Sequence, residues 1–204
     1  LADTYPGPGG VLWGPFAIAG DHLVFEANDT VHGRELWRSD GTPEGTELLV
    51  DANPGSASGN VGNLTGANGR AFYSSHSGGE GLELWVTDGT VAGTHAVLPF
   101  PSAEWPVHIN QFWVPGSDSR VIFRGGGPEG TEPWLSDGTA AGTYPLFDIW
   151  PGPMGSHPNP GVRAGDTLVF IADDGVTGYE LHAAPFAISE GWVVEADGGC
   201  LLYT

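Results

Sequence analysis

The chain has 204 residues, with 34 Gly, 17 Pro and a formal net charge of −19 that comes from 25 acidic residues against six Arg and no Lys. This charge repels phosphate groups, which argues against nucleic acid and anionic membranes as partners and leaves neutral ligands and cations open. The 8 Trp, 9 Phe and 5 Tyr exclude a disordered chain and indicate a folded β protein that is dense in turns.

One pattern occurs four times and divides the chain into units at approximately 8–55, 56–103, 104–152 and 153–199. Each unit contains a β-rich triplet, at 23–25, 71–73, 121–123 and 168–170, followed by Glu-Leu-Trp or a variant, at 35–37, 83–85, 132–134 and 180–182. The first three units continue with SDGTPEGT (39–46), TDGTVAGT (87–94) and SDGTAAGT (136–143). A period of about 48 residues is the size of one four-stranded propeller blade.

Each unit predicts four short strands, which in the first unit lie at 12–20, at 22–27, around 35–37 and at 46–52. Alternating β-branched and aromatic residues between Gly, Asn and Asp clusters are the signal for these strands. Asp-Gly between two apolar runs predicts a type I′ hairpin turn before the fourth strand.

The predicted fold is all-β: a single domain, 1–204, that forms a four-bladed β-propeller from four four-stranded repeats. Solenoid stacking of the same sheets is the structural alternative. Residues 1–7 (LADTYPG) resemble 49–55 (LVDANPG), so the chain opens with an outer strand that has no blade of its own. We expect this strand to close the fourth blade or to lie beside its edge, although 191–197 offers that blade a second candidate.

The motifs ELWRSDGT (35–42), ELWVTDGT (83–90) and EPWLSDGT (132–139) resemble those of the bacterial ELWxxDGT-repeat proteins. The resemblance covers nearly the whole chain and is weakest after about residue 183. It implies a secreted or cell-surface bacterial protein with propeller-like repeats, and it supplies no catalytic residues. The fourth unit departs from the pattern, with His182 in place of Trp and no Asp-Gly-Thr turn.

Residues present in every unit are explained by folding and packing, which every unit must do. We expect the tryptophans to pack between blades, the glutamates to accept hydrogen bonds from turn amides or Thr hydroxyls, and the aspartates to cap the turns. These residues are Trp37, Trp85 and Trp134; Glu35, Glu83, Glu132 and Glu180; and Asp40, Asp88 and Asp137.

Function is expected where the units differ, in the first strands, because inner strands line the central channel of a propeller. His108 and His157 share one aligned column with Leu12 and Asn60. Two imidazoles at one level can bind a divalent metal such as Zn or Ca, or act as acid and base, with Arg163 alongside. The alternatives are two unrelated polar loop residues, and an Arg163 that pairs with Asp166.

Amide and aromatic side chains accompany this column and suit a carbohydrate or another small neutral ligand. The amides donate and accept hydrogen bonds, whereas the indoles offer flat apolar faces. The candidate ligand-binding residues are Trp13, Asn63, Asn110, Gln111, Trp113 and Asn159.

Other classes of site have little support in the sequence. The loops at 26–33 and 171–178 carry several carboxylates but lack the DxDxDG pattern of a calcium site, so turn formation is the favoured interpretation. Cys200 is the only Cys, no G-x-S-x-G is present, and no apolar run approaches the roughly 18 residues of a membrane span.

Two functional hypotheses follow, with a third kept beside them. The first is an extracellular, lectin-like binding propeller that takes a neutral or cationic small ligand at the channel mouth. The second is an enzyme with one active site at the central channel, built on His108 and His157. A structural spacer without ligand is the third.

Overall fold

The computed structural model describes residues 14–78, 81–98, 110–113, 119–127, 130–186 and 201–202. For 98, 110–113 and 201–202 it describes the backbone alone. Several residues and segments named above lie outside these ranges: Trp13, His108 and Cys200, the opening strand 1–7, and 191–197. Every regular element within the described ranges is a β-strand.

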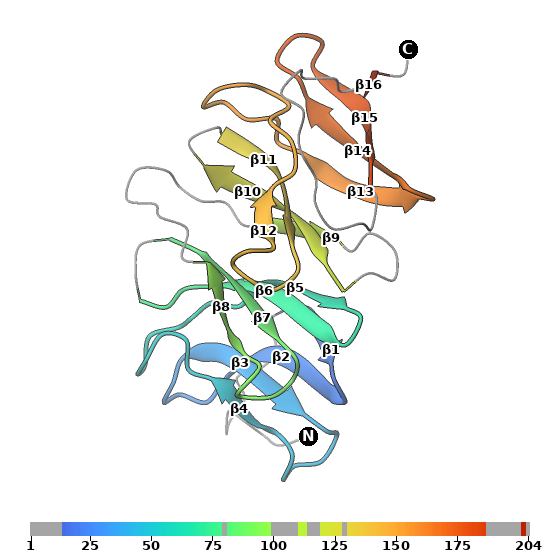
Figure 1. The fold of residues 1–204 in the computed structure, drawn as a ribbon. Helices are drawn as coiled ribbons and strands as arrows, with labels where there is room; N and C mark the ends of the chain where they lie inside the picture. The colour runs from blue at the N-terminus through green and yellow to red at the C-terminus, as the bar shows by residue number, and fades with distance from the viewer. Residues whose placement is uncertain are drawn as a thin grey trace.

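Sixteen strands form four antiparallel sheets of four strands each, and each sheet follows chain order (Figure 1). This confirms the all-β class and the four-stranded repeat. The first sheet contains β1 (Phe16–Ala19), β2 (His22–Asn28), β3 (Arg34–Ser39) and β4 (Glu47–Val50). The second contains β5 (Gly62–Ala67), β6 (Arg70–Ser75), β7 (Glu83–Thr87) and β8 (His95–Leu98). The third contains β9 (Asn110–Trp113), β10 (Val121–Gly127), β11 (Gly130–Ser136) and β12 (Thr143–Pro145). The fourth contains β13 (Asn159–Ala164), β14 (Thr167–Asp173), β15 (Tyr179–Pro185) and β16 (Leu201–Leu202).

In sheets one, two and four a tight two-residue turn joins the first strand to the second, whereas none joins the third strand to the fourth. Ala67 pairs with Arg70, and Asn68 and Gly69 between them both have positive φ, 42° and 84°, as a type I′ turn requires. The type I′ turn predicted at the Asp-Gly motif is wrong. A seven-residue loop, 40–46, separates β3 from β4, and Gly41 alone within it has positive φ.

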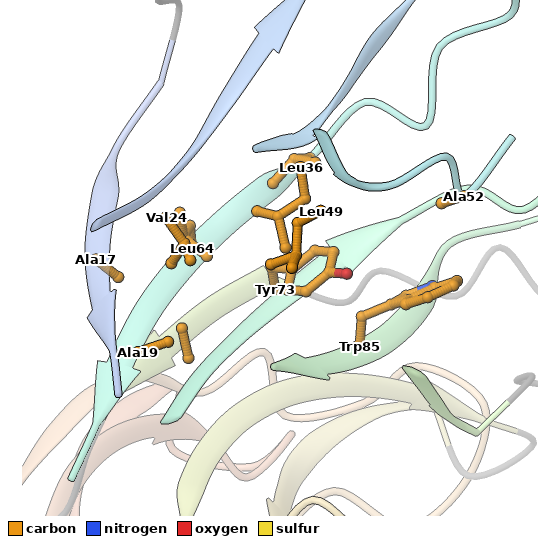
Figure 2. Close-up of a cluster of buried hydrophobic side chains, with 11 residues drawn as sticks. Ala17, Ala19, Val24, Leu36, Leu49, Ala52, Leu64, Tyr73 and Trp85 are labelled. Atoms are coloured by element: carbon orange, nitrogen blue, oxygen red, sulfur yellow. The ribbon is translucent and has the colours of Figure 1, made fainter. Parts of the chain in front are cut away.

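Consecutive sheets pack face to face through apolar side chains. We call the face turned toward the next sheet the trailing face and the face turned toward the preceding sheet the leading face. At the first junction, Val24 and Leu36 on the trailing face of sheet one meet Tyr73 and Trp85 on the leading face of sheet two (Figure 2). The alternation of side chains along each strand places these two sets on opposite faces of every sheet.

The second and third junctions repeat this arrangement. Phe72 and Leu84 of sheet two pack against Phe123 of sheet three, and Ile122 of sheet three packs against Phe170 of sheet four. The largest buried side chains therefore lie between sheets, and no single sheet holds the core alone.

The four sheets form an open series in which the first and fourth lie at opposite ends (Figure 1). Their first strands contact one another in the order β1, β5, β9, β13. The ring closure expected of a four-bladed propeller is therefore not seen between the described residues. β16 pairs with β15 through His182 and Leu202 as the fourth strand of the last sheet. Residues 1–7, expected to close the fourth blade or to lie beside its edge, lie outside the described ranges, so this stays a prediction.

Within the described ranges, no helix is long and apolar enough to cross a membrane.

Candidate ligand-binding site

The polar side chains of the repeated Asp-Gly-Thr loops bond within the loops. In the first copy, Ser39 Oγ accepts from the amide of Gly41, and Asp40 Oδ1 accepts from both the amide (2.9 Å) and the hydroxyl (2.7 Å) of Thr42. The Thr46 hydroxyl donates to the Thr42 carbonyl, 2.6 Å away. The second and third copies make the same bonds. The predicted capping role of the aspartates is confirmed.

Two of the repeated glutamates hold the linkers that lead into the next sheet. Glu35 is 0% exposed and accepts hydrogen bonds from the amides of Ala52 (3.0 Å), Asn53 (3.4 Å) and Gly59 (2.6 Å). Glu132 is 2% exposed and accepts from the amides of Ile149 and Ser156 and from the Ser156 hydroxyl, at 2.6 to 3.1 Å. The predicted amide bonds are confirmed here, but the amides belong to the linkers and not to the hairpin turns.

The other two glutamates of this column do not hold a linker among the described residues. Glu83 accepts from the Ser77 hydroxyl and from the indole N–H of Trp85. Glu180 is exposed.

Trp85 and Trp134 pack between sheets as predicted, against the cores of the first and second junctions. Trp37 instead packs with Phe25 and Ala27 of its own sheet. In the fourth sheet His182 takes the Trp position, 1% exposed and stacked on Phe170 with ring centroids 5.8 Å apart.

Asn60 and His157, which share one aligned position, both have left-handed backbone conformations. Each ends a linker between sheets, Asn60 before sheet two and His157 before sheet four. Asn60 has φ of 52° and His157 has φ of 46°. The amide of Asn60 donates to the Arg34 carbonyl, and the amide of His157 makes the equivalent bond to the Thr131 carbonyl, 3.0 Å away. Asn60 and His157 therefore share a backbone conformation and a backbone hydrogen bond. His108 lies outside the described residues, so its distance from His157 stays untested.

Directly after this position, three inner strands begin with an irregularity in pairing. The register of β5 shifts between Gly62 and Thr65, that of β13 shifts between Asn159 and Val162, and the pairing of β9 with β10 shifts between Ile122 and Arg124. Such bulges re-aim side chains and occur often beside functional sites. Sequence reasoning missed these bulges, although Gly and Asn inside a predicted strand are a signal for them.

Four of the predicted ligand-binding residues lie at these bulges: Asn63, Asn110, Gln111 and Asn159. Asn63 is exposed, has φ of 56°, and donates from Nδ2 to Ser74 Oγ, 3.2 Å away. Asn159 is half-buried and pairs with Ile171. β5 contacts β9 and β9 contacts β13, so the three bulged strands are neighbours.

Arg163 lies toward the other end of β13, four residues and roughly 13 Å along the strand from Asn159. Its guanidinium donates to the Gly165 carbonyl at 2.7 Å and pairs with Asp166 at 3.3 Å. These contacts tie its side chain to the turn that follows β13.

Arg124 holds the entry to β13, a role that the sequence did not reveal. Its guanidinium donates to the carbonyls of His157 and Pro158 at 2.9 to 3.1 Å. Arg34 similarly donates to Asn60 Oδ1 at the entry to β5.

Carboxylates in the two loops considered for calcium accept hydrogen bonds from loop amides. Asp29 accepts from the amides of Val31 and His32, and Asp174 accepts from those of Val176 and Thr177. Within the described ranges, no group of three or more His, Cys, Asp or Glu could hold a metal ion. These bonds support turn formation in both loops.

No family model matches the chain, and no curated protein matches it either. Among solved structures, the chain is similar to puromycin hydrolase, with a TM-score of 0.54 and 15% identity over 84% of this chain and 27% of the other. It is also similar to TolB from Acinetobacter baumannii, with a TM-score of 0.52 and 10% identity over 90% and 43% of the two chains. The chain is similar as well to the acylaminoacyl peptidase of Pyrococcus horikoshii, with a TM-score of 0.51 and 13% identity over 83% of this chain and 25% of the other.

These structural neighbours are propeller-domain proteins, and at such low identity the likeness shows the fold alone. The chain therefore has a β-propeller type of fold, and it spans a quarter to less than half of the length of these neighbours.

Proposed function

We propose that the chain is a ligand-binding module of the β-propeller type that takes a neutral small molecule of the carbohydrate class at the bulged starts of its inner strands. One observation carries the proposal. The polar residues that differ between units gather at three bulges on strands that contact in series, whereas the repeated polar residues bond to the scaffold.

The chemistry of the bulges suits a neutral ligand. Asn63, Asn110, Gln111 and Asn159 carry amides, which offer both donors and acceptors without charge. The formal charge of −19 adds a field that disfavours anionic ligands. A sugar hydroxyl is uncharged and both donates and accepts hydrogen bonds, so an amide side chain suits it as a partner.

The four sheets are best understood as consecutive propeller blades. Face-to-face packing in series and inner strands in mutual contact both support this arrangement. The resemblance of the motif to ELWxxDGT-repeat proteins supports a bacterial protein that works outside the cell or at its surface.

The test is a screen of the 204-residue protein against an array of neutral glycans, followed by calorimetric titration of any sugar that binds. Asn63→Asp and Asn159→Asp convert amide donors into carboxylates of the same size, and we expect each to weaken binding at least tenfold. Asp also tolerates the left-handed φ of Asn63, and the Ser74 hydroxyl can donate to it.

Asn68→Asp is the matched control, because it makes the same change at positive φ in the exposed turn at the opposite end of β5. It should bind as the wild type does. Equal loss in all three variants, or a sugar whose affinity none of them changes, would overturn the proposed site.

A further inference from the structure

Arg124 carries a half-buried charge that no carboxylate neutralises in the described part of the chain. Three other arginines form ion pairs: Arg34 with Glu26, Arg38 with Glu47, and Arg163 with Asp166. Arg124 forms none among the described residues, although the chain has 25 acidic residues in all. Burial lowers the pKa of its guanidinium, which shows that the charge is partly desolvated.

The Arg124 side chain lies where two of the bulged inner strands begin. Arg124 pairs with Asn110, the first residue of β9. Its guanidinium bonds to the carbonyls of His157 and Pro158, and β13 begins directly after them, at Asn159. Because Asn110 and Asn159 both belong to the proposed site, Arg124 brings a cation to that site.

One side of the guanidinium is left for a ligand. Nε and Nη2 donate to the Pro158 carbonyl at 3.1 and 2.9 Å, and Nη2 also donates to the His157 carbonyl at 3.0 Å. These bonds turn the Nε–Nη2 edge of the planar group toward the linker, so Nη1 lies on the opposite side. Between described residues, Nη1 makes no hydrogen bond.

The cation at this position belongs to one sheet alone. The aligned residues of sheets one, two and four are Glu26, Ser74 and Ile171. A role that every junction needed would be repeated in every unit, as the Asp-Gly-Thr loops are in the first three. Arg124 therefore belongs with the varied residues, among which the proposed site lies.

We infer that Arg124 binds the ligand directly through Nη1 and makes the proposed site select a sugar that carries an acetamido group. Nη1 can only donate, so its partner must be an acceptor. The carbonyl oxygen of an acetamido group accepts and cannot donate, whereas a hydroxyl, which does both, suits the amides of the bulges. A carboxylate would also accept, but the formal charge of −19 disfavours an anionic ligand. This inference rests on the proposed function and narrows its ligand class.

The test compares sugars that differ in this one group. The probes are the β-glycosides of N-acetylglucosamine and glucose, and of N-acetylgalactosamine and galactose, with a glucuronide as the acidic probe. In one pair or both, we expect the wild type to bind the acetamido sugar roughly tenfold more tightly, as one hydrogen bond from a charged donor allows. Calorimetric titration measures each affinity.

Arg124→Lys tests the residue that makes the choice. The ammonium keeps the charge and can donate to the same linker carbonyls, but it cannot also reach a ligand on the opposite side. We expect this variant to bind both members of a pair alike. A purely structural effect on β13 would weaken both sugars by the same factor and leave the preference intact, so the comparison separates the two roles.

Arg70→Lys is the matched control. The Arg70 guanidinium also donates to a backbone carbonyl of the next sheet, that of Asp137 at 2.9 Å, but Arg70 follows the turn at the far end of β5. This variant should keep the preference of the wild type.

Three results would overturn the inference while leaving the proposed function in place: sugar binding without preference for the acetamido member, tighter binding of the glucuronide, or a preference that survives Arg124→Lys. Binding of no sugar at all would overturn the proposed function and this inference with it.

Discussion

The single residues Glu35 and Glu132 fix the linkers between sheets by accepting hydrogen bonds from linker amides, and we call them clamps. Each buried carboxylate satisfies linker amides that would otherwise lack partners. Burial raises the pKa of each carboxyl to about 7, against the opposing effect of the hydrogen bonds that they accept. The sequence indicated that glutamates at this position are structural. It did not indicate which backbone they hold, because their partners lie 17 to 24 residues away.

We predict that Glu35→Gln lowers the free energy of unfolding by about 2 kcal/mol at pH 6. At this pH the carboxyl, whose pKa is about 7, is largely protonated, but both of its oxygens can still accept hydrogen bonds. The amide nitrogen of Gln cannot accept, so one backbone donor is left unsatisfied. Glu180→Gln makes the same change at the aligned exposed position and should cost less than about 0.5 kcal/mol. Urea denaturation of both variants measures the difference. Equal costs would contradict the clamp.

The raised pKa values predict that stability falls as pH increases. A carboxyl whose pKa is higher in the folded state stabilises fully below its ordinary value of 4.5, and this stabilisation is lost as the pH rises through about 7. For each clamp the change is at most on the order of 3 kcal/mol. Thermal unfolding between pH 5 and 8.5 stays above the isoelectric point of 4.3 and should show a falling Tm. The advantage of the wild type over Glu35→Gln should shrink over the same range, and a constant advantage would be the contrary result.

The Asp-Gly-Thr loops show why elements were easier to predict than their connections. Strand positions follow from alternating apolar residues, which depend on neighbouring residues alone. The Asp-Gly pair satisfies the local pattern of a type I′ turn, but Asp40 and Thr42 bond to each other in a seven-residue loop instead. Side-chain bonding to the backbone competed with the turn and prevailed.

Two glycines of these loops should differ in their tolerance of Ala. Gly41 has φ of 95° with open space around a Cβ, so Gly41→Ala should cost about 1–2 kcal/mol from backbone strain alone. Gly89 has φ of 86°, and a Cβ there would lie 2.4 Å from the Ala19 carbonyl oxygen of the preceding sheet. Gly89→Ala should therefore cost clearly more in urea denaturation. The reverse order would show that the loop does not touch the neighbouring sheet.

At the scale of the whole molecule, each described sheet packs face to face on the next one in the chain. The repeat period predicted the number of sheets and their four strands, because each blade is encoded by its own segment of about 48 residues. Ring closure depends instead on the small rotation between successive sheets, which no single unit encodes. The sequence likewise predicted a shared side-chain role at the aligned position of His157. Asn60 and His157 share a left-handed φ there, which the residue types did not reveal.

Truncation of the aligned leucine to Ala should cost more stability on an internal face than on an outer face of the sheet series. Leu84→Ala removes a fully buried side chain at the junction of sheets two and three and should cost about 3 kcal/mol. Leu181→Ala at the aligned, 55% exposed position of sheet four should cost less than about 1 kcal/mol in urea denaturation. Similar losses in the two variants would mean that Leu181 is covered in the folded protein.

The proposed function assigns the scaffold to the repeated residues and ligand binding to the varied starts of the inner strands. The most direct test is an amide NMR titration of the whole protein with a sugar identified on the array. If the proposed site is right, the largest shifts fall at Asn63 and Asn159 and at their neighbours on β5 and β13. Largest shifts in the repeated loops at 40–46, 88–94 and 137–143 would contradict it.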